Sequence, residues 1–236
     1  MGKIVFLLHA HLPFVRHPEY SRFLEEDWLF EAISETYLPL LRVFRSLDSD
    51  GIPSRMAVSL SPTLTAMLAD GLLQDRYLQH LDRLIELSES ECERNKGDEA
   101  FLPLAQMYRD LFLQNRHDFV ELYGKNILRG FADLASRGRI ELITTAATHS
   151  FLPLYQQYPE TIQAQIALGL SSHWQHFGQR PRGMWLPECG YYEGLENHLE
   201  RNGIEYFFSA SHAVLYGSQL PRNGVYAPVQ TPNGVM

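Results

Sequence analysis

The sequence predicts an α/β protein with a parallel β-sheet, and three observations support this fold class. Short apolar runs rich in β-forming residues alternate with longer stretches whose apolar residues recur at helical spacing. The short runs are continuous rather than alternating, as in strands buried on both faces. Each run also ends in polar or titratable residues. The alternation leaves two architectures open, an open doubly wound sheet and a barrel.

The first strand is expected at Ile4 to Leu8, buried on both faces, and it ends in His9-Ala10-His11. Because alternate residues of a strand point to one side, His9 and His11 should face the same way. A loop that contains Trp28 follows. Apolar residues then predict a helix over about 33–47, with Pro39 as a kink.

The second strand is expected at Met56 to Leu60 and ends in Ser61 and Thr63. A long helical region covers about 64–136, which is more than one crossover helix needs. We interpret about 90–125 as a helical insertion above the sheet. Residues 90–125 are therefore not expected to form a separate domain.

Three further strands follow the helical region. The third, Ile140 to Thr144, leads to Thr148 and His149, and the fourth, at 183–187, leads to Glu188. The fifth, at 205–209, leads to Ser211 and His212, and a sixth element is considered at 225–229. About five to six strands are therefore expected.

Composition narrows the class of protein. The 236 residues are 45% apolar and carry a net charge of −8, without a basic run, which argues against nucleic-acid binding. No apolar stretch is long enough for a signal peptide or a membrane span. Cys92 and Cys189, the only cysteines, are expected to be free thiols in a reducing compartment. We therefore expect a cytoplasmic enzyme.

The strand ends suggest one shared site. Parallel strands place all their carboxyl ends at one edge, where barrel enzymes bind ligands. Histidines close three of the expected strands, and Glu188 follows a fourth among aromatic rings. In one chemistry, Glu188 is the nucleophile of a retaining glycosidase, the histidines bind sugar hydroxyls, and Trp28, Trp185 and Tyr191 line sugar subsites. Trp185, inside its strand, also fits the core.

In the alternative chemistry, His9, His11 and His149 bind zinc, and Glu188 is a ligand or general base of a metal-dependent carbohydrate hydrolase or deacetylase. A His-x-His on a strand is compatible with either reading.

Three motifs in order resemble glycoside hydrolase family 57, and most of all its 1,4-α-glucan branching enzymes, with its 4-α-glucanotransferases as an alternative. They are His9-Ala-His11-Leu-Pro13, Ala147-Thr-His149-Ser-Phe-Leu-Pro153 and Trp185-Leu-Pro-Glu188-Cys-Gly-Tyr191. The resemblance implies that residues 1–236 form the N-terminal portion of a catalytic domain, an incomplete (β/α)7 barrel. It also implies a retaining mechanism without metal or other cofactor. It assigns the nucleophile to Glu188 and α-glucan binding to His9, His11 and His149, to which we add Trp28, Tyr191 and His212.

The sequence departs from the family pattern in one respect. Family members carry a general-acid aspartate on a later strand, and no aspartate of this chain follows an expected strand. Glu188 is thus expected to lack its acid partner within these residues. Three explanations remain: a fragment of a longer protein, a partner that completes the barrel, or a relative that only binds glucan.

Overall fold

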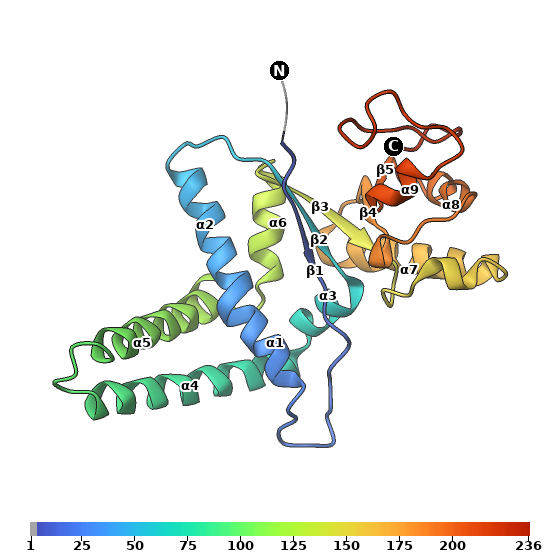
Figure 1. Ribbon diagram of the computed structural model, residues 1–236. Helices are drawn as coiled ribbons and strands as arrows, with labels where there is room; N and C mark the ends of the chain where they lie inside the picture. The colour runs from blue at the N-terminus through green and yellow to red at the C-terminus, as the bar shows by residue number, and fades with distance from the viewer. Residues whose placement is uncertain (1–3) are drawn as a thin grey trace. The chain divides into compact units, whose positions relative to one another are not determined.

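The computed structural model describes residues 4–236, which divide into two compact units (Figure 1). The first, called the sheet unit here, consists of residues 4–13, 55–66 and 140–236. The second, the helical unit, consists of residues 14–54 and 67–139.

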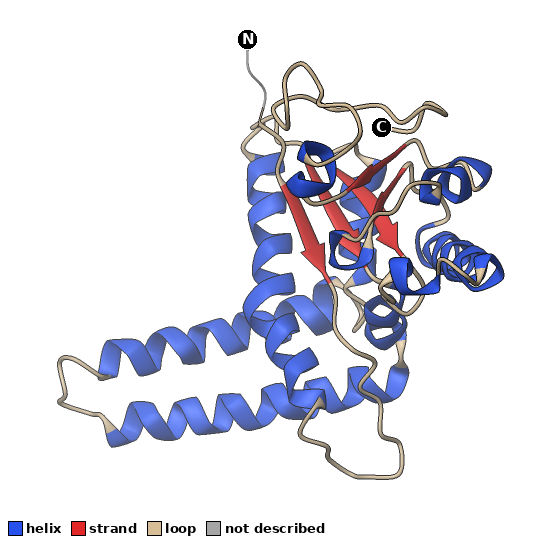
Figure 2. Ribbon diagram, turned by 45° about the vertical axis from the view of Figure 1, so that its right-hand side comes forward, coloured by secondary structure: helices blue, strands red, loops and turns tan. Residues whose placement is uncertain are grey.

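The sheet unit contains five parallel strands, each beside the next in the order of the chain. Figure 2 shows the strands in red. They are β1 (Leu7–Ala10), β2 (Met56–Leu60), β3 (Ile140–Thr145), β4 (Gly183–Trp185) and β5 (Tyr206–Phe208). A doubly wound sheet would show a reversal of strand order, whereas a barrel adds each strand beside the previous one. The predicted incomplete (β/α) barrel is confirmed, as a half-barrel of five parallel strands.

The first strand differs from the prediction. It begins at Leu7 rather than Ile4, and Ile4, Val5 and Phe6 have 83%, 74% and 59% of their surface exposed. The expected burial on both faces is therefore wrong. The reason is that β1 is an edge strand of the sheet, with β2 as its only neighbour among residues 4–236.

The sixth element was also misplaced. Residues 225–229 form neither helix nor strand. The backbone next to β5 is instead that of Met236, which accepts a hydrogen bond from the Phe207 N–H and donates one to the Glu205 carbonyl. Turn-forming residues around 217–224 and 231–234 flank this run, and such flanking turns are typical of a strand or helix.

Helices in the sheet unit follow β3, β4 and β5. They are η3 (Leu152–Tyr155), α7 (Pro159–Phe177), η4 (Pro187–Cys189), α8 (Leu195–Arg201) and α9 (Ser211–Leu215), while α3 (Pro62–Ala69) is divided between the two units. Helix α7 packs on β3, and α8 packs on α7. Their apolar faces form one core, which contains Ala146, Leu152, Ile162, Ile166, Leu170, Met184, Leu186, Leu195, Leu199 and Ile204.

The helical unit contains α1 (Glu26–Ala32), η1 (Ile33–Tyr37), α2 (Leu38–Ser49), α4 (Gly71–Arg94), α5 (Leu102–His117), η2 (Asp118–Leu122) and α6 (Leu128–Ser136). Near Pro39, where the sequence predicts a kink, the helix contains a π-helical turn, η1, which ends at Tyr37, two residues before this proline. Proline has no N–H for the helical ladder, and a wider turn accommodates the break.

A buried polar network links these helices. The Arg42 guanidinium donates to Asn115 at 2.9 Å and to Asp118 at 2.7 Å. The Asn115 amide donates to the Ser34 carbonyl at 3.0 Å, and the Ser34 and Tyr77 hydroxyls are 2.9 Å apart. These five side chains are therefore hydrogen-bonded to one another or to the backbone, which offsets the cost of their desolvation.

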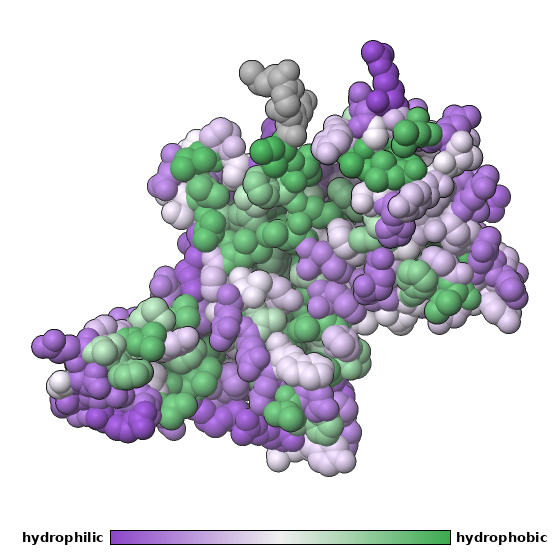
Figure 3. Space-filling model, viewed as in Figure 1, coloured by the Kyte–Doolittle hydropathy of each residue, from purple (hydrophilic) through white to green (hydrophobic). Residues whose placement is uncertain are grey.

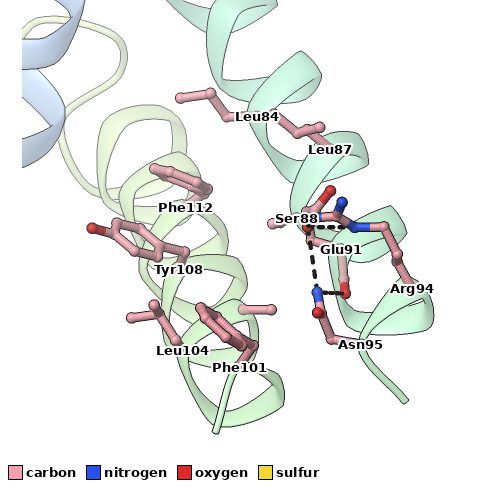
Figure 4. A pocket seen from close by; sticks show the side chains of 11 residues that line it. Leu84, Leu87, Ser88, Glu91, Arg94, Asn95, Phe101, Leu104, Tyr108 and Phe112 are labelled. Carbon is pink, nitrogen blue, oxygen red and sulfur yellow. Dashed lines mark hydrogen bonds and ion pairs between the residues drawn. The ribbon is translucent and has the colours of Figure 1, made fainter. Parts of the chain in front are cut away.

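Helices α4 and α5 form a long hairpin with a hydrophobic face near its tip (Figure 3). A groove of about 300 Å³ lies between the two helices there. Leu104, Tyr108 and Phe112 line it from α5, and Leu84 and Leu87 from α4 (Figure 4). At its edge, Glu91 pairs with Arg94 and accepts from Asn95. The polar side chains at the edge of the groove thus bind one another.

The predicted insertion falls inside the helical unit. Residues 90–125 cover the end of α4, all of α5 and η2. The helical unit is larger than that insertion because it also includes residues 14–54 and 126–139. Among residues 4–236, no helix combines the length and apolarity that a membrane span requires.

Candidate functional site

Two strands of the sheet unit bring their polar ends together. His9 lies on β1, His11 directly follows it, and His149 lies in the turn after β3. The ring centroids of His11 and His149 are 3.9 Å apart, and those of His9 and His149 are 5.1 Å apart. We call these three residues the histidine cluster. The prediction that His9 and His11 face the same way is confirmed, since both stack on His149.

Strand register gives two of these histidines a serine partner. His9 lies opposite Ser59 in the β1–β2 pair, and His9 Nδ1 is 3.1 Å from the Ser59 hydroxyl oxygen. One pleat further, His11 Nδ1 is 3.0 Å from the Ser61 hydroxyl oxygen. Both serines are fully buried. The His-x-His of β1 is therefore held by a Ser-x-Ser of β2.

Trp185, at the end of β4, forms one wall of the cluster. Its ring stacks on His9, with centroids 4.6 Å apart and an interplanar angle of 14°. It also stacks on Phe208 of β5, at 6.3 Å. Trp185 is only half-buried, and it lies beside the candidate site rather than within the core.

All three imidazoles are neutral near pH 7. Burial, with smaller contributions from His149 and His11, lowers the pKa of His9 to about 4. Burial and then His149 lower the pKa of His11 to about 4. Burial also lowers the pKa of His149, although Glu188 opposes this shift.

Glu188 follows β4 in the short turn η4, at the carboxyl edge of the sheet as predicted. Its side chain is 76% exposed, and its carboxylate oxygen Oε1 lies 3.9 Å from His149 Nδ1. His149, Glu188 and Cys189 have φ angles of 55°, 52° and 56°, in the left-handed region. Such conformations cost about 1–3 kcal/mol each and cluster at functional sites.

A cavity of about 440 Å³ lies next to Glu188. We call it the Glu188 cavity; its lining includes Phe151, Tyr191, Tyr192, Glu193, His212 and Tyr216. The Tyr191 hydroxyl donates to Glu196 at 2.8 Å, and its ring stacks on Phe207. Burial and then Glu196 raise the pKa of Tyr191 above its usual value. Aromatic faces beside hydrogen-bonding groups suit the apolar faces and hydroxyls of a sugar.

The structure brings most of the predicted site residues into this region, but not all. His9, His11, His149 and Glu188 lie together, and Tyr191 and His212 line the adjoining cavity. Trp28 belongs to α1 of the helical unit, where 51% of its surface is exposed. Its predicted contact with substrate stays a prediction.

Sequence reasoning missed Ser59 and Phe151. Ser59 could have been found, because it precedes Ser61 by two positions and so faces the same way on β2. Phe151 packs against Gly190, at which a Cβ would lie 2.3 Å from the Phe151 ring. No sequence pattern indicates that contact.

The site lacks both aspartates and a metal-binding group of side chains among the described residues. Every aspartate of the sequence lies within the helical unit, so the unit that holds Glu188 contains none. Within residues 4–236, no group of three or more His, Cys, Asp or Glu side chains has a geometry that could hold a metal ion. Cys92 and Cys189 are free thiols, as predicted.

Comparisons with known proteins agree with this geometry. A family model for Glycosyl hydrolase family 57 matches residues 5–236. The 1,4-alpha-glucan branching enzyme TK1436 of Thermococcus kodakarensis is 34% identical over 97% of this chain and 35% of its own length. Two solved structures are also similar, the alpha-amylase AmyC from Thermotoga maritima and a branching enzyme from Pyrococcus horikoshii.

The Thermotoga structure is 47% identical, with a TM-score of 0.95, and the match covers 99% of this chain and 44% of that one. For the Pyrococcus enzyme the identity is 31%, the TM-score 0.88, and the coverage 99% and 46%. The chain thus spans less than half the length of these relatives. Because the family model matches nearly all of its residues, this chain belongs to glycosyl hydrolase family 57.

Proposed function

We propose that this chain provides the nucleophile and much of the substrate site of a retaining α-glucan transglycosylase, of the 1,4-α-glucan branching type. The observation that carries the proposal is the position of Glu188. Its exposed carboxylate stands at the carboxyl edge of the sheet, between the histidine cluster and the Glu188 cavity. Barrel enzymes use that edge for catalysis.

In this mechanism, a Glu188 carboxylate oxygen attacks the anomeric carbon C1 of a bound glucose unit. The C1–O4 bond breaks, the leaving oxygen takes a proton from a general acid, and a glycosyl ester forms on Glu188. A 6-hydroxyl of a second glucan chain then attacks C1 and loses its proton to the same acid residue, now a base. The product is an α-1,6 branch, and Glu188 is released.

The general acid is a separate question. A retaining glycosidase needs a second carboxyl group ~5–5.5 Å from the nucleophile. The sheet unit has no aspartate, and the chain covers 35% of the Thermococcus relative. We propose that a C-terminal segment or a partner chain completes the barrel and supplies this group.

Covalent labelling tests the nucleophile. An α-maltosyl fluoride with a second fluorine at C5 needs no general acid, because fluoride leaves with the electron pair of the C1–F bond unprotonated. The C5 fluorine slows the later hydrolysis, so the glycosyl ester accumulates. We expect mass spectrometry of the 236-residue chain to find one maltosyl group on the peptide containing Glu188, and none in Glu188→Gln. The matched control Glu193→Gln, in the same cavity, should still be labelled at Glu188. Labelling of another residue would refute the assignment.

The type of reaction requires a second assay, because one of the similar structures is described as an amylase and two relatives as branching enzymes. Amylose should be incubated with the longest product of the gene and then treated with an α-1,6-specific debranching enzyme. Branching predicts new short chains after debranching, without new reducing ends before it. A rise in reducing ends alone would indicate hydrolysis, and amylose binding without either change would indicate a binding module.

A further inference from the structure

The hydrogen bonds around the histidine cluster determine where the protons of its imidazoles and hydroxyls lie. Each neutral imidazole carries one ring proton, and each hydroxyl carries one. Every close pair of polar atoms needs one proton between them. Where the count of protons has a single solution, it fixes which ring nitrogen of each histidine is a donor.

The count around His11 has one solution. The Thr63 hydroxyl lies 2.9 Å from the Leu12 carbonyl, which can only accept, so the Thr63 proton is used there. Ser61 and Thr63 are 3.1 Å apart, and this contact therefore needs the Ser61 proton. The 3.0 Å contact between Ser61 and His11 is then left with the imidazole proton. His11 thus carries its proton on Nδ1, and its Nε2 is an acceptor.

The remaining contacts agree with this solution. The Ser61 oxygen also accepts the Leu64 N–H at 3.3 Å, so it accepts two hydrogen bonds and donates one. Thr63 lies 3.4 Å from His11 Nδ1, within reach of the same ring proton. If Ser61 donated to His11 instead, the Ser61–Thr63 contact would have no proton.

His9 and His149 form a second chain of contacts. His9 Nε2 lies 3.0 Å from His149 Nε2, and His9 Nδ1 lies 3.1 Å from the Ser59 hydroxyl oxygen. Among the side-chain hydrogen bonds of residues 4–236, Ser59 takes part in this one alone. If His9 Nδ1 donated to Ser59, the buried hydroxyl proton of Ser59 would have no acceptor in that network.

If Ser59 donates to His9 instead, every proton of this chain of contacts has an acceptor. Ser59 donates to His9 Nδ1, His9 Nε2–H donates to His149 Nε2, and the His149 proton lies on Nδ1. That nitrogen faces the Glu188 carboxylate at 3.9 Å. An N–H there attracts the carboxylate, whereas a lone pair would repel it.

We infer that Ser59, Ser61 and Thr63 are positioning residues that fix the tautomers of the histidine cluster. His149 then presents a donor to Glu188, and His11 presents an acceptor, Nε2, for a hydroxyl of the substrate. The lowered pKa values of the three histidines keep them neutral, as this scheme requires. The tautomers can be measured on the unliganded chain, whereas their effect on catalysis rests on the proposed function.

Nitrogen-15 NMR of the histidine side chains tests the tautomers directly. The chain is labelled with ¹⁵N-histidine at neutral pH, and each ring is assigned by a His→Gln substitution. We expect the proton on Nε2 of His9, on Nδ1 of His11 and on Nδ1 of His149. Ser59→Ala should convert His9 and His149 to a mixture of tautomers, and Ser59→Thr, which keeps a hydroxyl, should restore single forms.

Two controls separate positioning from folding. Thr65→Val removes another buried hydroxyl of the same unit, one that is bonded to the Pro62 carbonyl and not to an imidazole, and it should change no tautomer. Circular dichroism should show that all variants fold. A parent spectrum with His9 protonated on Nδ1, or His11 on Nε2, would overturn the inference.

The catalytic consequence has its own measurement. Ser59→Ala should slow the labelling of Glu188 by the fluoride substrate about fivefold, the equivalent of one neutral hydrogen bond, with rescue in Ser59→Thr. Unchanged labelling in Ser59→Ala would refute the positioning role. If neither the 236-residue chain nor the longest product of the gene is labelled at Glu188, the proposed function fails, while the NMR result still decides the tautomers.

Discussion

At the scale of single residues, backbone conformation separates the candidate site from the rest of the chain. Within residues 4–236, three of the four non-glycine residues with positive φ, His149, Glu188 and Cys189, lie there. β4 ends at Trp185, and the left-handed residues Glu188 and Cys189 turn the chain in the short helix η4 that follows, where the Glu188 side chain is exposed. The strain is balanced by packing and hydrogen bonds, such as the Ser209 hydroxyl bond to the Cys189 carbonyl at 3.0 Å.

His173 of α7 predicts how stability depends on pH. It is 2% exposed, and neither of its ring nitrogens has a hydrogen-bond partner among the described residues. Burial and then His176 lower its pKa from 6.5 to about 4. The unfolded chain therefore binds a proton between pH 6.5 and about 4, and the folded chain does not. The free energy of unfolding is therefore unaffected by His173 above pH 6.5. It falls by about 3 kcal/mol in total as the pH drops from 6.5 to about 4.

We expect His173→Leu to reduce the loss of unfolding free energy between pH 6.5 and 4, measured by urea denaturation. His9 and His11, with similar pKa values, should maintain part of the slope. The control His212→Gln replaces an exposed imidazole and should leave the slope as it is. If the unfolding free energy of His173→Leu depended on pH as strongly as that of the parent chain, the prediction would be wrong.

At the scale of elements, the approach of α7 to β3 depends on a glycine. A Cβ on Gly169 would lie 2.4 Å from the Thr145 carbonyl oxygen, a backbone atom that cannot move without the strand. Alanine normally stabilises a helix relative to glycine. Here the overpacking should dominate, and Gly169→Ala should destabilise the chain by about 1–3 kcal/mol.

Gly71, the first residue of α4, provides the matched control for this prediction. A Cβ there would have no atom within 4 Å, so Gly71→Ala should stabilise the chain by about 0.4–1 kcal/mol. Guanidinium denaturation of both variants measures the two effects. Equal signs for the two substitutions would show that the close approach of α7 to β3 does not limit the side chain at residue 169.

The ends of the strands show how much of the fold and of the candidate site could be predicted from the sequence. The apolar run of β2 begins and ends where the strand does, because both neighbours are present and its residues are mostly buried. The ends of β1 could not be predicted from composition, since Ile4 and Val5 look like core residues but have no partner strand beside them. The histidines and Glu188 were found because parallel strands bring their ends together. Ser59, hidden inside a strand of apolar appearance, was not.

At the scale of the whole molecule, the path of the chain links the two units. It passes between them after residues 13, 54, 66 and 139, so neither unit is one continuous segment. The histidine cluster draws on all three segments of the sheet unit when its serine partners are included. A single proteolytic cut within the helical unit would therefore place residues of this site on two separate pieces of the chain, even though no residue of the site was removed.

The exposed apolar residues before β1 predict how the chain behaves in solution. Ile4, Val5 and Phe6 are more than half exposed and lead into an edge strand. Unpaired strand edges with apolar side chains associate with one another. We expect the 236-residue chain to self-associate with increasing concentration, measured by light scattering and sedimentation. Val5→Lys should reduce this, because a charge cannot be buried between two edges without cost. The matched control Val43→Lys, on the surface of α2 with 52% exposure, should not. If both variants behave alike, the apolar segment before β1 is not the surface that associates.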